Sequence, residues 1–233
     1  MSLNEYQLLY IIGEGCDGLV YRAIDSLGRV VAIKKTLIID PIHNEVKMHS
    51  EISHLPFIPT LYQHFIVKTN QYLVMELIKG QSLCQSWRGY KSWDHIWMTT
   101  LHALQVIRDL HNAGYYHGDL HLNNLMWTGE NMWLIDLDSV GLINYECGNM
   151  NQQHRINNKI RSDYMDILNI TGIRRYGTNM KNDNHSLERY QLLCELSMNI
   201  PCNGTDKNGK YVTDSEYVSR LIEEHDIIDR LIF

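Results

Sequence analysis

Residues 10–35, YIIGEGCDGLVYRAIDSLGRVVAIKK, decide the fold that this sequence predicts. β-Branched and aromatic residues on both sides of the glycines indicate strands joined by turns. Glycines at 13, 15 and 18 allow the backbone to approach a bulky anion and to point N–H groups at it. A dinucleotide site needs a helix directly after such glycines, but LVYRAI predicts a strand, so a plain glycine-rich hairpin is the alternative. VAIKK then places Lys34 in a strand, 16 residues after Gly18, where an ammonium could reach phosphates.

Two polar motifs follow in the second half of the chain. Residues 117–124 read HGDLHLNN, with Asn124 five positions after Asp119, and residues 134–139 read LIDLDS. A zinc site at His117 and His121 would need a helix to bring the rings together and a third ligand. The glycine and the asparagine pair predict a loop instead, so zinc is the disfavoured interpretation.

The order of these motifs resembles the eukaryotic-like protein kinase family: a GxGxxGxV hairpin, VAIK, H-x-D-x-x-x-x-N and an aspartate motif. The resemblance covers residues 10–170 and is that of a compact, atypical member, with an HGDLH catalytic loop and DLD in place of DFG. It implies an α+β, bilobal protein-kinase-like fold in a single domain, residues 1–233. A strand-rich N-lobe at 1–79 would precede a reduced helical C-lobe at 80–233.

The resemblance implies that Lys34 pairs with the α/β-phosphates of ATP and with a glutamate of the next helix. Glu45 shares a helical stripe with apolar residues and would need a partner there. It is the preferred glutamate because its spacing to the following Ile52, Leu55 and strand better fits the family pattern. Glu51 is the alternative, since its distance from Lys34 along the chain is closer to the usual family spacing. The alternative for either residue is an ordinary surface glutamate that is exposed to solvent and has no role in a site.

The two polar motifs acquire roles through the same resemblance. Asp119 would accept the proton of the substrate hydroxyl, and Asn124 and Asp136 would bind Mg²⁺. His117 would be a packing residue behind the loop. Asp163, in RSDYMDILNI, would hold the catalytic loop backbone.

The other ATP-binding residues are also implied by the resemblance. Met75 would be the gatekeeper, and the backbone of Glu76–Ile78 would bond the adenine edge. The full set is Gly13, Glu14, Gly15, Gly18, Val20, Ala32, Lys34, Met75, Glu76, Ile78 and Met126.

Several residues depart from the family pattern. Gly118 replaces an arginine that reads a phosphate on the activation loop in many members, so control by loop phosphorylation is not expected. His121 stands where serine/threonine kinases carry a lysine, and Asp138 replaces the glycine of DFG. Asp17 would bring a negative charge near phosphates. The interval after Asp136 is short and lacks an Ala-Pro-Glu signature, which indicates a trimmed substrate platform.

The preferred function is therefore an ATP- and Mg²⁺-dependent serine/threonine protein kinase that acts on a protein substrate. One alternative is a small-molecule or atypical kinase. The other is a pseudokinase scaffold that binds nucleotide without transfer. The retained lysine, aspartates and asparagine argue against the scaffold, whereas Asp17 and Asp138 leave room for it.

Composition agrees with a chain of this class. The 233 residues are 44% hydrophobic, enough for a sizeable core, and the net charge of −6 argues against a general nucleic-acid binder. Five scattered cysteines without a CxxC pair indicate reduced thiols, hence a cytoplasmic protein, or one of the host-cell cytosol if it comes from a virus or intracellular bacterium. No apolar run reaches the roughly 20 residues of a membrane span. No secretory signal is expected, and the oligomeric state stays open.

The remaining pattern predicts the other elements. Further strands are expected at 58–67, 71–78, 125–128 and 132–137. Helices are expected from Asp40-Pro41, at 93–112, from 162 onward and at 216–233. Residues 144–160 are rich in asparagine and glutamine and are predicted to be the least structured.

Overall fold

The computed structural model describes residues 3–15, 18–37, 44–88, 93–143 and 150–170. The chain forms two compact units: unit 1 comprises Met1–Gly80 and Trp133–Asp138, and unit 2 comprises Gln81–Met132 and Ser139–Phe233. Unit 1 is rich in strands, and the described part of unit 2 is mainly helical. The predicted α+β class is confirmed.

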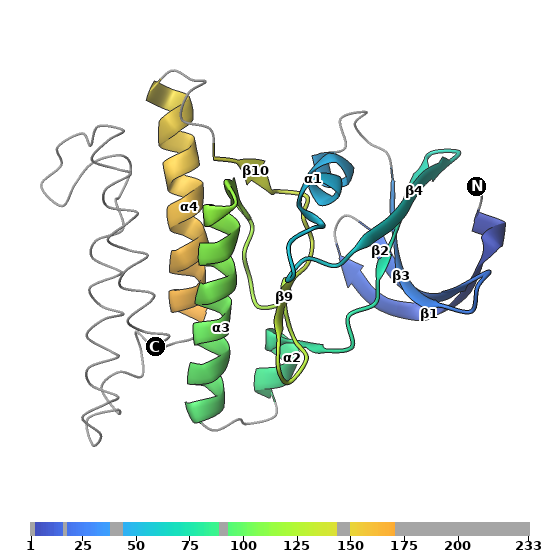
Figure 1. The fold of residues 1–233 in the computed structure, drawn as a ribbon, viewed down its shortest axis with the longest axis horizontal. Coiled ribbons are helices and arrows are strands. Elements are labelled where there is room, and N and C mark those ends of the chain that lie inside the picture. The colour runs from blue at the N-terminus through green and yellow to red at the C-terminus, as the bar shows by residue number, and fades with distance from the viewer. Residues whose placement is uncertain (1–2, 16–17, 38–43, 89–92, 144–149, 171–233) are drawn as a thin grey trace, which may run out of the picture. The chain divides into compact units, whose positions relative to one another are not determined.

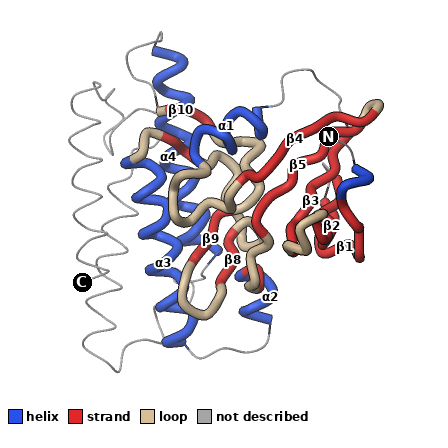
Figure 2. The backbone as a smooth tube through the Cα atoms, turned by 45° about the vertical axis from the view of Figure 1, so that its right-hand side comes forward, coloured by secondary structure: helices blue, strands red, loops and turns tan. Residues whose placement is uncertain are grey.

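Unit 1 is built on a five-stranded antiparallel sheet in the order β1-β2-β3-β5-β4 (Figures 1 and 2). Its strands are β1 (Tyr6–Gly15), β2 (Gly18–Asp25), β3 (Val30–Leu37), β4 (Leu61–Val67) and β5 (Asn70–Glu76), and a 3-10 turn, η1 (Leu3–Glu5), precedes them. These segments are rich in β-branched and aromatic residues, which suit a half-buried pleated surface. The predicted strands are present, with ends shifted by a few residues.

One face of this sheet carries the apolar core of unit 1. Its buried members are Ala23, Val31, Ile33, Phe65, Tyr72 and Val74. The rings of Phe65 and Tyr72 stack with their centroids 5.3 Å apart. Side chains alternate between the two faces of a sheet along each strand. Because Val31 and Ile33 of β3 point to this face, Ala32 and Lys34 point to the other one.

Gly18 opens β2 at a point where β2 and β3 come very close. A Cβ atom at this position would lie 2.0 Å from the carbonyl oxygen of Lys35, so the strand pairing requires glycine. The neighbouring Asp17, which departs from the family pattern, lies outside the described residues.

Helix α1 (Asn44–Ile52) belongs to unit 1. Its buried residues recur at helical spacing: Glu45, Met48, His49 and Ile52. The predicted helix start at Asp40-Pro41 falls outside the described residues. The buried stripe thus combines two apolar residues with two ionisable ones.

His49 on this stripe is expected to make folding sensitive to mild acid. The residue is 2% exposed, and its neutral ring can donate from Nε2 to the carbonyl oxygen of Pro59 at 2.6 Å. Burial lowers the pKa of His49, the hydrogen bond to Pro59 opposes this, and the charge of Lys34 lowers the pKa further. The unfolded chain takes up this proton near pH 6.5 and the folded chain only at lower pH, so stability falls as the pH drops below about 6.5.

The test compares the wild type with His49→Gln, which keeps a side-chain donor and cannot titrate. Between about pH 7.5 and about pH 5.5, the thermal unfolding midpoint of the wild type should fall more than that of the variant. Equal falls in the two proteins would show that His49 does not contribute.

The described part of unit 2 contains α2 (Leu83–Arg88), α3 (Trp93–Asn112) and α4 (Met150–Ile170). Helices α3 and α4 lie side by side (Figures 1 and 2). Their buried apolar residues include Ala103, Leu104, Ile107 and Leu110 on α3 and Ile160, Tyr164 and Ile167 on α4. Helix α3 has the predicted bounds.

Short strands complete the described structure. A three-stranded sheet has the order β6 (Gln81–Ser82), β8 (Leu125–Trp127) and β9 (Met132–Leu134), and β7 (Tyr115–Tyr116) pairs with β10 (Gly141–Leu142). Strands β8 and β9 fall within the predicted segments, whereas β6, β7, β10 and α2 are too short to leave a periodic pattern. No helix in the described ranges is long and apolar enough to cross a bilayer.

The prediction of little structure at 144–160 is wrong for residues 150–160, because α4 begins at Met150. Asparagine has only modest helix propensity, which made this segment read as a loop. Ile156, Ile160, Tyr164 and Ile167 nevertheless recur at helical spacing, and packing against α3 supplies the stability that propensity does not. Residues 144–149, 171–233 and the helix expected at 216–233 lie outside the described residues.

Candidate active site

Lys34 leaves the centre of the unit 1 sheet on the face opposite the apolar core. Its neighbours across the sheet are Val20 on β2 and Leu73 on β5. Lys34 is 8% exposed, although lysine is rarely buried without a partner. The position therefore demands acceptors close to the ammonium.

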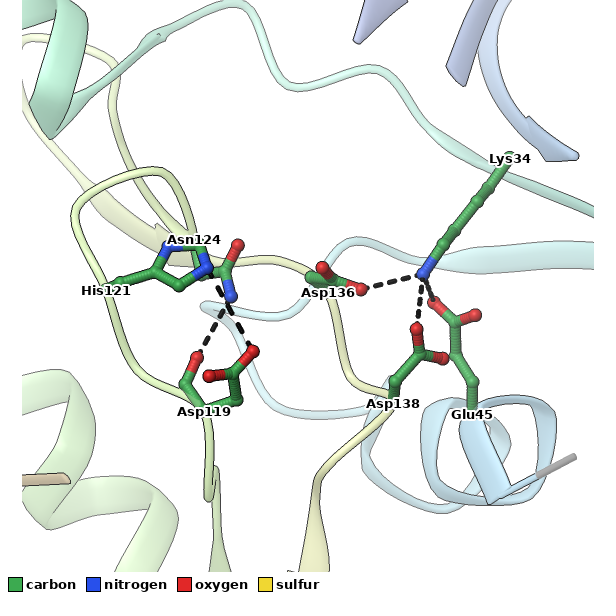
Figure 3. A network of polar contacts seen from close by, with 7 residues as sticks. All are labelled: Lys34, Glu45, Asp119, His121, Asn124, Asp136 and Asp138. Atoms are coloured by element: carbon green, nitrogen blue, oxygen red, sulfur yellow. Dashed lines mark hydrogen bonds and ion pairs between the residues drawn. The ribbon is translucent and has the colours of Figure 1, made fainter. Parts of the chain in front are cut away.

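Three carboxylates supply them (Figure 3). The Lys34 Nζ lies 2.8 Å from Glu45 Oε1, 2.7 Å from Asp136 Oδ1 and 3.0 Å from Asp138 Oδ2. Glu45 comes from α1, and the two aspartates follow β9. An ammonium has three N–H donors, so each donor has a carboxylate within reach. These four residues, all in unit 1, are called the Lys34 cluster.

The charges of the Lys34 cluster are strongly interdependent. Burial lowers the pKa of Lys34, but the charges of Glu45, Asp136 and Asp138 outweigh it and keep this pKa above its usual value. Burial raises the pKa of Glu45, Lys34 opposes this, and a hydrogen bond with Asp138 raises it further. Burial also acts to raise the pKa of Asp138, but the bond to Glu45 and the charge of Lys34 bring it below its usual value. Lys34 therefore stays protonated, and the three carboxyl groups around it outnumber its single positive charge.

Glu45, and not Glu51, is the glutamate that contacts Lys34. The side chain of Glu45 is 5% exposed, and that of Glu51 is 36% exposed with its Oε1 4.0 Å from Lys47 Nζ. The reason lies in helix geometry, because Glu45 shares the buried stripe of Met48 and Ile52. An exposed pair such as Glu51–Lys47 contributes little to stability.

Asp136 has a left-handed backbone, with φ 63°. Aspartate tolerates this conformation better than most residues, but it still carries strain that the surroundings must support. The short contact with Lys34 is one such support. Carboxylate oxygens of Glu45, Asp136 and Asp138 lie within 4.8 Å of one another, and the two aspartates are the more exposed members. Such oxygens are the ligands that Mg²⁺ prefers.

In unit 2, the HGDLHLNN loop at 117–124 is anchored on α4 by Asp163. This residue is 0% exposed. Its Oδ2 accepts from His117 N at 2.7 Å and contacts His111 Nε2 at 3.0 Å, and its Oδ1 accepts from Gly118 N at 2.8 Å. The buried carboxylate is therefore surrounded by donors, two of which belong to the loop backbone.

Lys159, one helical turn before Asp163, binds the carbonyl group of the same residue, Gly118. Its Nζ donates to the carbonyl oxygen of Gly118 at 2.7 Å. Gly118 has φ 80°, and a Cβ atom there would lie 2.7 Å from the carbonyl oxygen of Ser139. A close backbone approach and a left-handed conformation thus both favour glycine directly before Asp119.

Asp119 itself points a solvent-exposed carboxylate from this anchored backbone (Figure 3). Its side chain is 64% exposed, and His121 Nε2 lies 4.0 Å from Asp119 Oδ2. Asn124 is 3% exposed and donates from Nδ2 to the Asp119 carbonyl oxygen at 3.0 Å. The loop therefore presents an accessible proton acceptor on a fixed support, and Asn124 retains an amide oxygen able to bind a cation.

A family model of the protein kinase domain matches residues 6–195. The chain belongs to the protein kinase family. It is 32% identical over 124 residues to serine/threonine-protein kinase 4 homolog A of Dictyostelium discoideum, a match that covers 49% of the chain and 26% of that protein. It is 29% identical over 130 residues to probable serine/threonine-protein kinase zyg-1 of Caenorhabditis elegans, covering 53% and 18%. Sperm motility kinase 2B of Mus musculus is 32% identical over 129 residues, covering 52% and 26%.

These matches span about a quarter or less of each relative's length. The family resemblance read from the motifs is confirmed. The roles of the individual residues stay predictions.

The predicted nucleotide-binding residues of this chain lie on several strands. In unit 1, Gly13, Val20 and Lys34 are consecutive cross-strand neighbours on β1, β2 and β3, and Ala32 pairs with Met75 across β3 and β5. The others are Glu14 and Gly15 on β1, Gly18 on β2, Glu76 at the end of β5, the buried Ile78 after it, and Met126 on β8 in unit 2. Glu76 N donates to the carbonyl oxygen of Thr60 at 2.9 Å, so this amide already has an acceptor.

Sequence reasoning missed three features of the kinase site. Asp138 stands out as a replacement for glycine, but its contact with Lys34 was not foreseen. His111 belongs to the periodic face of a helix, which gives no hint of its contact with Asp163. Lys159 has no signal beyond its position four residues before Asp163. That spacing is typical of one face of a helix, but Lys159 lies in the segment at 144–160 that the sequence predicts to be the least structured.

Proposed function

We propose that this chain is an ATP- and Mg²⁺-dependent protein kinase that phosphorylates serine or threonine. The observation that carries the proposal is the buried Lys34 ammonium, held at 2.8 Å by Glu45 and at 2.7 Å by Asp136. A lysine ammonium that stays charged and is held in one orientation suits the binding of phosphates. The names of the relatives support serine or threonine as the acceptor.

Most of the chemistry in this proposal is positioning and charge neutralisation. Lys34 orients the α/β-phosphates, and Glu45 keeps its ammonium in place. Asp119 orients the acceptor hydroxyl and takes its proton as the phosphoryl group is transferred. Asp163 and Lys159 keep the backbone before Asp119 fixed, which holds the carboxylate in one place without blocking it.

The available ligands fit Mg²⁺. Asp136 offers a partly exposed carboxylate and Asn124 an amide oxygen, and hard oxygen atoms of this kind suit the ion. When bound, Mg²⁺ would neutralise charge on the phosphates. Asp136 would be a protein ligand of the ion, as is predicted separately for Asn124, and Glu45 would stay with Lys34.

Control by phosphorylation of the activation loop is not part of the proposal. Gly118 occupies the place of the arginine that would read such a phosphate, and Lys159 and Asp163 already satisfy its backbone. A loop held in this way does not need an added charge to take its shape. The kinase is therefore proposed to be competent without that modification.

The test is transfer from radiolabelled ATP to generic protein substrates, comparing the wild type with Asp136→Asn. We expect labelled phosphoserine or phosphothreonine with the wild type. In the variant, transfer should fall by about 10²-fold or more, because one anionic metal ligand is lost. In the wild type, ATP should raise the thermal unfolding midpoint more when Mg²⁺ is present.

The same experiment separates the two alternatives. ATP binding without transfer to proteins or to the chain itself would favour a pseudokinase scaffold. Consumption of ATP only with added small hydroxylated acceptors would favour a small-molecule kinase.

A further inference from the structure

Asp138 stands where the kinase family has glycine, and it adds a third carboxylate to Lys34. Its Oδ2 is 3.0 Å from Lys34 Nζ, and its side chain is 38% exposed. A glycine here would leave one ammonium donor without this acceptor. The residue is thus a feature of this chain rather than of the family pattern.

The hydrogen-bond capacity of Lys34 decides what this feature does. An ammonium has three N–H donors, and Glu45, Asp136 and Asp138 are each within hydrogen-bond distance of it. A phosphate oxygen can therefore reach Lys34 only where one of these carboxylates withdraws. Glu45 is buried on α1, whereas the two aspartates are both more than a third exposed.

The two aspartates differ in the interactions that they could form after moving away from Lys34. Asp136 has a cation to bind in the proposed function, so it exchanges one positive partner for another. Asp138 is not one of the metal ligands of the proposed function, and by withdrawing it would lose its contacts with Lys34 and Glu45. If it stays, its negative charge remains beside the phosphates, and like charges in a partly buried site repel strongly.

We propose that Asp138 competes with the nucleotide phosphates for Lys34 and thereby sets a low affinity for ATP. This inference rests on the proposed function, because it assumes that Lys34 binds the phosphates. Neutralising Asp138 should release an ammonium donor and remove a repulsive charge, and both changes favour the nucleotide. Asp138 acts through Lys34, so it is a positioning residue and not a catalytic one.

The experiment measures dissociation constants of the full chain by calorimetry, for ATP with excess Mg²⁺ and separately for adenosine. In Asp138→Asn the constant for ATP should fall about tenfold, a difference of about 1.4 kcal/mol. The constant for adenosine should not change, because adenosine has no phosphates. A general structural effect of the substitution would alter both ligands. Asp138→Glu restores the charge and should bind ATP within about twofold of the wild type.

Asp109→Asn is the matched control. Asp109 has the same side-chain exposure, 38%, and also contacts a basic residue, Arg108, at 3.0 Å, but it lies on α3 outside the Lys34 cluster. Its ATP affinity should equal that of the wild type. Asp138→Gly, the residue of the family, serves as the second test variant if Asp138→Asn does not unfold cooperatively.

The outcomes distinguish this inference from the proposed function. If the wild type binds ATP and the folded Asp138 variants bind it equally or more weakly, the competition is refuted and the proposed function stands. If neither the wild type nor these variants bind ATP, both are refuted. Binding by the variants alone would support the competition in its strongest form.

Discussion

Asp119→Asn is expected to lower the turnover number of the kinase by roughly 10²- to 10⁴-fold, the range usually contributed by a positioned acid or base. The amide has nearly the same shape as the carboxylate but cannot accept the proton of the acceptor hydroxyl. Because the Asp119 side chain is 64% exposed and Asn124 binds its backbone carbonyl, the loop should keep its structure. The Michaelis constant for ATP should therefore change little.

Initial rates of phosphate transfer at saturating ATP test this expectation. Glu130→Gln is a suitable control, because Glu130 is an exposed carboxylate in a turn of the same unit. It should have the wild-type rate. An Asp119→Asn enzyme that keeps more than about a tenth of the wild-type turnover would contradict the role assigned to Asp119.

Asp163→Asn is expected to produce the largest loss of stability. The carboxylate of Asp163 is 0% exposed and is within hydrogen-bond distance of three nitrogen atoms, those of His117, Gly118 and the His111 ring. An amide would turn its own N–H groups toward at least one of these donors, which would leave buried groups without an acceptor. We expect a loss of about 3–5 kcal/mol in the free energy of unfolding.

Chemical denaturation followed by circular dichroism measures this loss, with Asp166→Asn as the control on the same helix. Asp166 is partly buried and accepts from Ser162 at 2.9 Å, and burial raises its pKa, so a neutral amide suits its surroundings. Its substitution should cost about 1 kcal/mol or less. Comparable losses in the two variants would mean that Asp163 is not a special anchor.

The parts of the fold that could be predicted from sequence are those with a strong local signal. Helix α3 has 20 residues, with Leu104, Ile107 and Leu110 recurring on one face and Gly114 after its end, so both its type and its bounds were predictable. The strands around Lys34 carry β-branched residues and glycines at diagnostic spacing. Each of these signals lies within a short stretch of chain.

The parts that escaped prediction depend on contacts between distant stretches of chain. The first turns of α4 are polar, and only packing against α3 makes them helical. The contact of Asp138 with Lys34 joins residues 104 positions apart and follows the left-handed backbone at Asp136. No local pattern encodes such a contact. Helical periodicity is a local signal, and it already placed Glu45 on the same stripe as Met48 and Ile52.

The hydrogen bonds from α4 to the backbone of Gly118 also limit where the chain can tolerate an insertion. Lys159 and Asp163 both reach the backbone of Gly118 because four residues complete about one helical turn. An extra residue inserted between them would rotate one side chain by about 100° relative to the other, and only one of them could then reach Gly118. The separation between the two α4 residues therefore matters as much to the loop as their charges do.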